Sequence, residues 1–204
     1  MLSVLLPKPS EASPPMFESR FVDRFSRVHA ATVPAIYVPA MLVLAYWSVV
    51  EAGVSVVSTL GLAVGGFVAW TLTEYWLHRM LFHWTPGGEW GKRFHFILHG
   101  VHHDYPNDKL RLVMPTFVSA TLFWVFLGLF VLVLGELAWG FHAGFVVGYM
   151  WYDLGHYYLH HFQPKSKWAR AWRRHHMMHH AQKVAGDRKY AVSNTFWDHV
   201  FGTY

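Results

Sequence analysis

The chain has 204 residues, of which 53% are hydrophobic and only 14% are charged, an unusual balance for a soluble globular protein. It contains no cysteine, which excludes disulfides, thiolate metal ligands and a cysteine nucleophile. The net charge of +5 comes from basic residues that flank apolar stretches. Contact with anionic lipid headgroups explains them better than nucleic acid does, and we expect no nucleic-acid partner.

Residues 1–32 precede the first long apolar stretch. Their prolines predict a mobile leader over residues 1–16, and residues 17–28 predict a short amphipathic helix on the membrane surface. Four apolar stretches follow, each near the ~20 residues that cross a ~30 Å hydrocarbon layer. They predict spans at about 33–50, 54–73, 116–134 and 137–152. We therefore expect residues 33–204 to form one membrane-embedded domain; the alternative is a soluble bundle that buries these stretches.

The basic residues predict how the spans are oriented. The short connections at residues 51–53 and 135–136 contain no Lys or Arg, and all 17 basic residues lie before, between or after the two hairpins. By the positive-inside rule, both termini and residues 78–115 are cytosolic. The predicted fold is an all-α integral membrane protein with four transmembrane helices in two hairpins.

Histidines concentrate beyond the ends of the second and fourth spans. No proline interrupts residues 54–85 or 137–163, so both helices can continue past the membrane surface. Thirteen of the 16 histidines fall in four segments: "HRMLFH" (78–83), "HFILHGVHH" (95–103), "HYYLHH" (156–161) and "HHMMHH" (175–180). His29, His142 and His199 lie outside them, and we expect these three to be structural.

The histidine spacing suits metal binding. On a helix, positions i and i+3 or i+4 share a face. The pairs at this spacing are His99 with His102 or His103, His156 with His160, and His176 with His179 or His180. Neighbours such as His102 and His103 diverge by about 100°, which favours two metals. His78 and His83, five residues apart, would diverge by about 140°, which predicts either two centres or a local break in the helix.

The predicted site therefore holds two metal ions in a cytosolic, histidine-rich helical cap. Imidazole ligands suit iron, zinc, copper or nickel, and zinc could be the metal bound after purification. About ten histidines give two metals roughly five ligands each and leave a coordination position for O₂. A structural zinc ion, in contrast, usually has four protein ligands and no open position. The ligand number therefore favours redox chemistry, while imidazole alone does not discriminate among these metals.

These segments, together with "HGVHHDYPNDKLRLVMP" (99–115) and "FWDHVFGTY" (196–204), resemble the fatty acid 2-hydroxylases of the fatty acid hydroxylase/sterol desaturase superfamily. The resemblance runs from about residue 70 to the end of the chain. It implies a non-haem di-iron monooxygenase that uses O₂ and two electrons to hydroxylate C2 of a long-chain acyl group, often in a sphingolipid or ceramide. The alternatives are a carotenoid or sterol hydroxylase or desaturase of the superfamily and, less favoured, a histidine-rich membrane metal transporter.

The resemblance also implies roles for individual residues. The implied metal ligands are His78, His83, His99, His102, His103, His156, His160, His176, His179 and His180. Residues expected to support the ligands from outside are His95, His161, His175, Asp153 and Asp187, and further carboxylates that could accept an imidazole N–H are Glu74, Asp104 and Asp198. Lys109 and Arg111 could face a lipid headgroup where the substrate approaches, or be ordinary positive-inside residues.

The source of electrons is the one departure from the family pattern. Eukaryotic members usually carry an N-terminal cytochrome b5 domain, whereas about 30 residues precede the first span here. "TPGG" (85–88) shares three letters with the haem-binding HPGG sequence, but its context predicts a turn. We therefore expect a separate electron donor, a cytochrome b5-like protein or a ferredoxin with its reductase. The same feature predicts a bacterial inner membrane rather than the endoplasmic reticulum.

Overall fold

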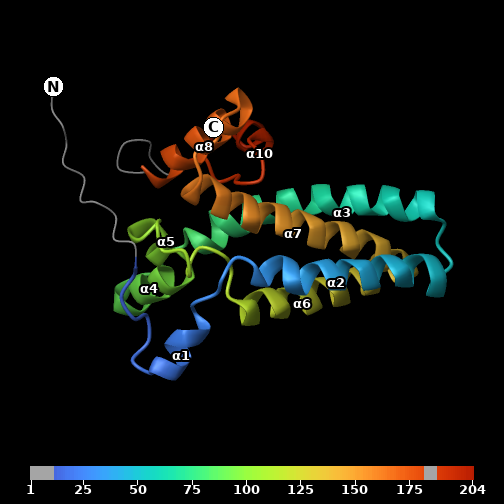
Figure 1. Ribbon diagram of the computed structural model, residues 1–204, viewed down its shortest axis with the longest axis horizontal. Helices are drawn as coiled ribbons and strands as arrows, with labels where there is room; N and C mark the ends of the chain where they lie inside the picture. Colours follow the sequence, from blue (N-terminus) through green and yellow to red (C-terminus); the bar gives the residue numbers. More distant parts are fainter. Residues whose placement is uncertain (1–11, 182–187) are drawn as a thin grey trace.

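The protein is described by a computed structural model over residues 12–181 and 188–204, and all regular structure in these two ranges is helical. Four long helices run side by side, and shorter helices gather at one end of them (Figure 1). The long helices are α2 (Thr32–Tyr46), α3 (Val56–Trp76), α6 (Thr116–Leu134) and α7 (Ala138–His161). The shorter ones are α1 (Arg20–Phe25), α4 (Gly88–His95), α5 (Val101–Asp104), α8 (Lys167–His180) and α10 (Phe196–Val200). Widened π-helical turns are η1 (Trp47–Glu51), η2 (Leu77–Phe82) and η3 (Phe96–Gly100), and η4 (Gly135–Leu137) is a tighter 3-10 turn.

Three helical segments are long and apolar enough to cross a membrane: Thr32–Glu51, Val56–Phe82 and Thr116–His161. The last is 46 residues long because only the turn η4 joins α6 to α7. The chain reverses there, where Gly135 has φ +56°. The rings of Phe126 and Phe145 lie 4.8 Å apart, and those of Phe130 and Phe141 lie 4.9 Å apart. These contacts pair α6 with α7 in antiparallel fashion, so the four predicted spans correspond to three continuous helical segments.

Large apolar side chains cover the outside of the long helices. The most exposed ones, which expose between 67% and 83% of their surface, are Val57, Phe117, Trp124, Leu132 and Val133. Such a surface is unfavourable in water and is satisfied by lipid, while the helices bond their own backbone groups internally. The structure therefore agrees with a membrane protein rather than with a soluble bundle.

Helix α7 lies at the centre, where glycines let the neighbouring backbone approach. Gly140, Gly144 and Gly148 recur every four residues along α7. A Cβ atom at Gly144 would lie 1.8 Å from the backbone oxygen of Ala63 in α3, so any side chain there would force the two helices apart. Close approach through small residues is the usual way in which helices associate in lipid. It fixes the ends of α3 and α7, the two long helices that carry histidines, side by side.

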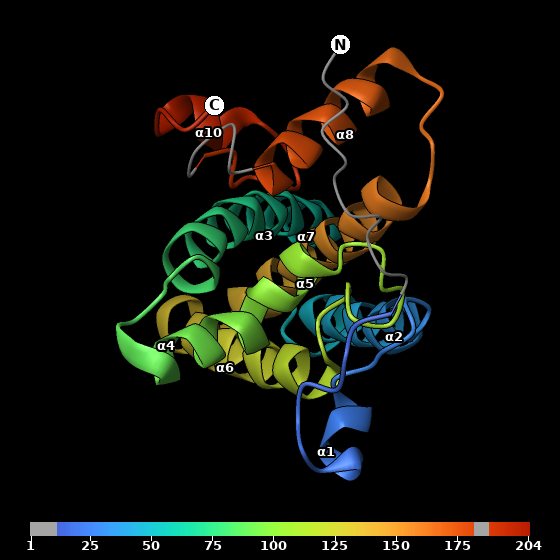
Figure 2. The same ribbon diagram turned by 90° about the vertical axis from the view of Figure 1, so that its left-hand side faces the viewer.

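The C-terminal segment is fastened onto α3 at the histidine-rich end. Glu74 of α3 accepts hydrogen bonds of 2.8 Å from the backbone N–H groups of both Val192 and Ser193. Tyr75 is fully buried beside Tyr190, with ring centroids 6.1 Å apart. Figure 2 looks onto this end and shows α5 lying across it, with α8 and α10 beside α3.

The predicted surface helix is shorter than expected. Helix α1 has six residues and begins after Ser19, whose side chain accepts a hydrogen bond from the backbone N–H of Val22. Its rings Phe21 and Phe25 are 72% and 60% exposed, as expected for a helix that lies on a membrane. Most of the predicted leader, residues 1–11, lies outside the described ranges.

Candidate metal centre

Ten histidines converge in two groups of five at this end of the bundle. Group A consists of His78, His83, His99, His103 and His179, and group B of His102, His156, His160, His176 and His180. In each group, one ring nitrogen from every residue lies within 4.8 Å of the others. The two groups together contain the same ten residues that the family resemblance implied as ligands.

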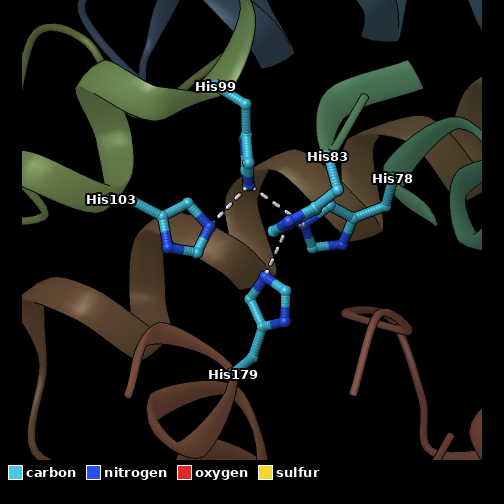
Figure 3. A group of neighbouring side chains, drawn as sticks. All are labelled: His78, His83, His99, His103 and His179. Atoms are coloured by element: carbon cyan, nitrogen blue, oxygen red, sulfur yellow. Dashed lines mark hydrogen bonds between the residues drawn. The ribbon is translucent and has the colours of Figure 1, made fainter. Parts of the chain in front are cut away.

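Group A brings together side chains from three parts of the chain (Figure 3). Turn η2 and the residue after it supply His78 and His83, the η3–α5 segment supplies His99 and His103, and α8 supplies His179. The Nε2 atom of His99 lies 3.0 Å from that of His78 and 2.9 Å from that of His103. The Nε2 atom of His83 lies 3.1 Å from that of His179. All five rings therefore turn their Nε2 edges toward one point.

Group B lies between α5, α7 and α8. The Nε2 atom of His176 lies 2.8 Å from that of His160 and 3.1 Å from that of His180. His180 in turn lies 3.0 Å from His102, again between Nε2 atoms. His156 is buried with its ring centroid 4.5 Å from those of His102 and His176, but neither of its nitrogens has a hydrogen-bond partner among the described residues.

A widened helical turn explains how His78 and His83 reach the same group. In an α-helix, residues five apart point in different directions. Turn η2 is π-helical, and the backbone N–H of His83 donates to the carbonyl of His78 over 3.1 Å. This i to i+5 bond adds one residue to the turn and places the two side chains together. Of the two predicted alternatives, the local break in the helix is therefore the one that occurs.

Neighbouring histidines divide between the groups, as their 100° separation on a helix predicts. His102 belongs to group B and His103 to group A, while His179 belongs to A and His180 to B. The rings of His103 and His180 stack with centroids 4.4 Å apart, so the groups touch. Helices α5 and α8 therefore each contribute to both groups.

The arrangement fits one metal ion in each group. Two imidazole nitrogens about 2.1 Å from the same ion, at right angles, lie about 3 Å apart, and the observed Nε2 separations are 2.8–3.3 Å. The Nδ1 atom of His78 lies 2.5 Å from the carbonyl oxygen of Tyr190, and that of His179 lies 2.8 Å from the carbonyl oxygen of Arg188. A carbonyl only accepts, so these Nδ1 atoms carry the protons and the Nε2 lone pairs face the centre.

Burial keeps these histidines neutral. Removal from water, and then the proximity of the other histidines, lowers the pKa of His99, His102, His176 and His180 well below the ordinary value of 6.5. The same causes lower the pKa of His103 to about 2. At neutral pH these lone pairs are free for a metal, and no proton has to be displaced.

Asp198 holds the carbonyl that orients His78. This carboxylate is fully buried and accepts hydrogen bonds from the backbone N–H groups of Tyr190 (2.9 Å) and Ala191 (3.1 Å) and from the hydroxyl of Thr203 (2.7 Å). The sequence suggested that carboxylates would bind imidazole N–H groups directly. In the structure two backbone carbonyls do so, and Asp198 fixes the segment that presents one of them. Every residue has a backbone carbonyl, so the sequence does not indicate which carbonyls contact a histidine, and sequence reasoning missed these two.

The three histidines expected to support the ligands lie outside both groups. His175 has its Nε2 atom 2.9 Å from Asp198 and stacks on Tyr204. The ring of His95 lies 6.3 Å from that of His83, and its buried Nδ1 atom has no hydrogen-bond partner among the described residues. His161 contacts the ring of Tyr157 at 4.4 Å. Only His175 is therefore linked, through Asp198, to the segment that orients a group A histidine.

The two carboxylates expected beside the ligands have different outcomes. Asp153 is buried and accepts hydrogen bonds from the backbone N–H of Met114 (3.2 Å) and the hydroxyl of Tyr149 (2.9 Å). Its hydrogen-bond partners within the described ranges include no histidine, so it braces α7 against the chain before α6. Asp187 lies outside the described residues.

The two cations expected at the substrate approach also differ. Arg111 is buried, and its guanidinium donates to the carboxylate of Asp23 over 2.6 Å and to the hydroxyl of Ser13 over 2.8 Å. An arginine held in this way cannot reach a headgroup, and it instead ties the N-terminal segment to the chain before α6. Of the pair, Lys109 alone is exposed and free to face a lipid.

Comparison with known proteins agrees with the geometry. A family model described as fatty acid hydroxylase matches residues 63–203. A dihydroceramide fatty acyl 2-hydroxylase of Arabidopsis thaliana is 37% identical, over 93% of this chain and 79% of that protein. A ceramide very long chain fatty acid hydroxylase of Saccharomyces cerevisiae is 35% identical, over 95% of this chain and 50% of that protein. A solved structure of full-length scs7p, with only its hydroxylase domain visible, has a TM-score of 0.83 and 33% identity, covering 91% of this chain and 70% of that one.

The sources of the relatives correct one prediction. They include plants, yeasts and mammals, so the expectation of a bacterial inner membrane is wrong. That expectation rested on the lack of a fused electron carrier. However, two Arabidopsis relatives are matched over 79% and 82% of their length, which shows that eukaryotic hydroxylases also occur with little sequence beyond the shared part. The chain spans about half the length of the yeast and mammalian relatives.

Proposed function

The chain belongs to the fatty acid hydroxylase family, and on this premise we propose that it hydroxylates C2 of long-chain fatty acyl groups carried by ceramide or a related sphingolipid. The two groups of five convergent histidines carry the proposal. Relatives at 32–37% identity, named as dihydroceramide or fatty acid 2-hydroxylases, support the substrate class and the position.

The stoichiometry of the hydroxylation determines which atoms, electrons and protons must be supplied. One atom of O₂ enters the C–H bond at C2, the other leaves as water, and the balance requires two electrons and two protons. Iron held by the imidazoles of both groups would supply the redox chemistry that this reaction requires, which zinc cannot supply. Zinc could still occupy the same imidazoles after purification. Group A and group B would each hold one ion through their Nε2 atoms.

The fold supports a four-span arrangement with the histidine groups at one membrane surface. We place α2, α3, α6 and α7 in the membrane, residues 33–204 in one embedded domain, and residues 1–32 at the surface. All described Lys and Arg residues belong to the histidine-rich end, and the connections at the far end carry Glu51 and Glu136 instead. This asymmetry is the pattern of the positive-inside rule.

Position at the membrane surface supports the choice of C2. A lipid with its headgroup at the interface has its first acyl carbons just inside the hydrocarbon layer. His78 and His156 lie near the ends of the long helices, close to that depth. Holding the headgroup would therefore bring C2, rather than a carbon in the middle of the chain, to the histidine groups. The buried imidazoles fix the centres rigidly and exclude water from them.

The electrons would come from a one-electron protein carrier, cytochrome b5-like or ferredoxin-like, together with its reductase. The chain itself contains no cysteine for an iron–sulfur cluster. Two reduced carriers would each give up one electron in every turnover.

Lipid analysis tests the proposal. The iron-loaded protein, supplied with a carrier and its reductase, should produce 2-hydroxy acyl chains that mass spectrometry detects. The variants His99→Ala and His179→Ala should abolish them, whereas His95→Ala, outside both groups, should keep most of the activity. Full activity in the first two variants would refute the assignment of the centre. Hydroxylated sterols or carotenoids, in place of 2-hydroxy acyl chains, would refute the substrate class.

A further inference from the structure

Helix α8 has two faces of opposite character. Its inner face is buried and includes Trp172, His176 and His179. Its outer face carries Lys167, Arg170 and Arg174, all exposed and spaced by three and four residues, so they form one stripe. The helix that supplies ligands to both histidine groups therefore presents a row of cations to the outside.

This outer stripe is strongly and uniformly basic. We define the basic face of α8 as Lys167, Arg170 and Arg174 together with Lys165, which lies just before the helix. Residues 165–181 contain no Asp or Glu. Within the part of the chain that the structure describes, no carboxylate forms an ion pair with any of its four cations, in contrast to the cations beside α1. Trp168, 62% exposed, lies on another side of the helix, with its ring 5.2 Å from that of Trp172.

The basic face lies close to both histidine groups. Helix α8 gives His179 to group A and His176 and His180 to group B. An α-helix with its side chains is about 10 Å across, so a protein bound to the outer face is separated from both groups by roughly one helix. Electron transfer slows steeply with distance. Other exposed cations, such as Arg20 and Arg24, belong to α1, which contributes no histidine to either group.

We propose that the basic face of α8 is the docking site for an acidic one-electron protein carrier that supplies the reaction. The proposal rests on the proposed function, because that reaction consumes two electrons. Each carrier is oxidised by one electron, and two such transfers with two protons reduce the second atom of O₂ to water. Unpaired cations favour an acidic partner and speed its association.

Charge reversal tests the docking site. The variant Lys167→Glu/Arg170→Glu/Arg174→Glu changes exposed residues only, and a Glu at the start of α8 favours the helix dipole. The full-length protein in nanodiscs of zwitterionic lipid is titrated with the reduced soluble haem domain of a cytochrome b5, an acidic carrier, at low ionic strength. We expect the variant to weaken binding at least about tenfold and to slow oxidation of the haem similarly, and added salt to remove the difference.

The control with the same charge change is Arg20→Glu/Arg24→Glu/Lys92→Glu, at exposed residues of α1 and α4, which lie on the other side of this end of the bundle from α8 (Figure 2). Its Lys92 also loses an exposed ion pair with Glu89, which contributes little to stability. This control should bind the carrier nearly as tightly as the unchanged protein does. The proposal would be overturned if both variants lost the same amount of carrier affinity. It would also be overturned if the α8 variant bound the carrier as tightly as the unchanged protein. If the α8 variant instead lost only binding to vesicles of anionic lipid, the basic face would be a membrane contact and the proposal would be wrong.

A peroxide-driven reaction separates this proposal from the proposed function. Hydrogen peroxide supplies the oxygen atom and both electrons, with water as the other product, so no carrier is needed. The α8 variant should form 2-hydroxy product with peroxide as the unchanged protein does. If the unchanged protein forms none with peroxide or with the carrier, the proposed function fails, and the binding titration still decides the docking site.

Discussion

Asp198 offers the sharpest test of how the protein orients its histidines. Its carboxylate accepts four hydrogen bonds, from the backbone N–H groups of Tyr190 and Ala191, the hydroxyl of Thr203 and the ring of His175. Asp198→Asn keeps the size of the side chain but replaces one oxygen with an NH₂ group. That group faces two donors and cannot accept from either.

The expected loss of stability follows from the number of hydrogen bonds that the substitution removes. Each carboxylate oxygen accepts from one backbone N–H and from one group that can also accept, either the Thr203 hydroxyl or the His175 ring. One backbone N–H therefore loses its acceptor, which should reduce the free energy of unfolding by about 1–3 kcal/mol. The carbonyl of Tyr190, 2.5 Å from Nδ1 of His78, shares a planar peptide unit with the N–H of Ala191, which Asp198 holds, so the two move together. Loss of such a partner usually weakens metal binding about 10–100-fold. Group A should lose affinity in this range, and group B should change less.

Metal titration of the metal-free protein in detergent, with thermal unfolding of the same samples, measures both effects. Asp104→Asn is the matched control, because Asp104 follows His103 directly but is exposed, and its carboxylate has no hydrogen-bond partner within residues 12–181 and 188–204. It should change stability by no more than about 0.5 kcal/mol. Our account of the orienting carbonyl would be refuted if Asp198→Asn matched this control in both metal affinity and stability.

Three further predictions follow from the packing and the histidine groups. His156→Ala leaves group B with four imidazoles in place of five, so metal titration should show weaker binding of one of the two metals; unchanged affinity for both would contradict the grouping. Gly144→Ala should destabilise the protein by about 1–3 kcal/mol in thermal unfolding, since its Cβ would lie 1.8 Å from Ala63, whereas Gly128→Ala, with open space around it, should not. The metal-free protein should lose stability as the pH falls from 7 to 5. The pKa values of His99, His102 and His176 lie well below the unfolded value of 6.5, so their stabilisation is full above that pH and decreases by up to about 1.4 kcal/mol per pH unit and histidine below it. An unfolding midpoint that stayed constant over this range would contradict the burial of neutral histidines.

The long helices could be predicted because lipid imposes a simple rule. A stretch of about 20 apolar residues predicts a membrane-spanning helix without any knowledge of its tertiary contacts. The short connection predicted at residues 135–136 also agrees with the structure, where the chain turns within η4 at the positive φ of Gly135. The predicted surface helix differs, and the difference depends on local geometry. The surface helix α1 ends at Phe25, because Ser26 and Arg27 already bond back to Asp23 and Arg24.

The histidine pairs could be predicted from helical geometry, but what surrounds them could not. Pairs four apart, such as His156 and His160, need only a regular helix to meet. His78 and His83 need the widened turn η2, which the sequence could suggest only as a break. The orienting carbonyls of Tyr190 and Arg188 come from a segment more than 100 residues after His78, and only the fold brings that segment near.

The division of adjacent histidines couples the two groups. Helix α5 places His102 and His103 on opposite sides, and α8 does the same with His179 and His180. A metal bound in group A therefore holds α5 and α8 in the position that group B also requires. A metal ion that binds the ordered helices more tightly than the disordered ones shifts both groups toward the ordered state. By thermodynamic linkage, a metal in group B favours binding in group A to the same extent. Two separate sites on separate helices would fill independently, whereas these two shared helices predict that the second metal binds more readily than the first.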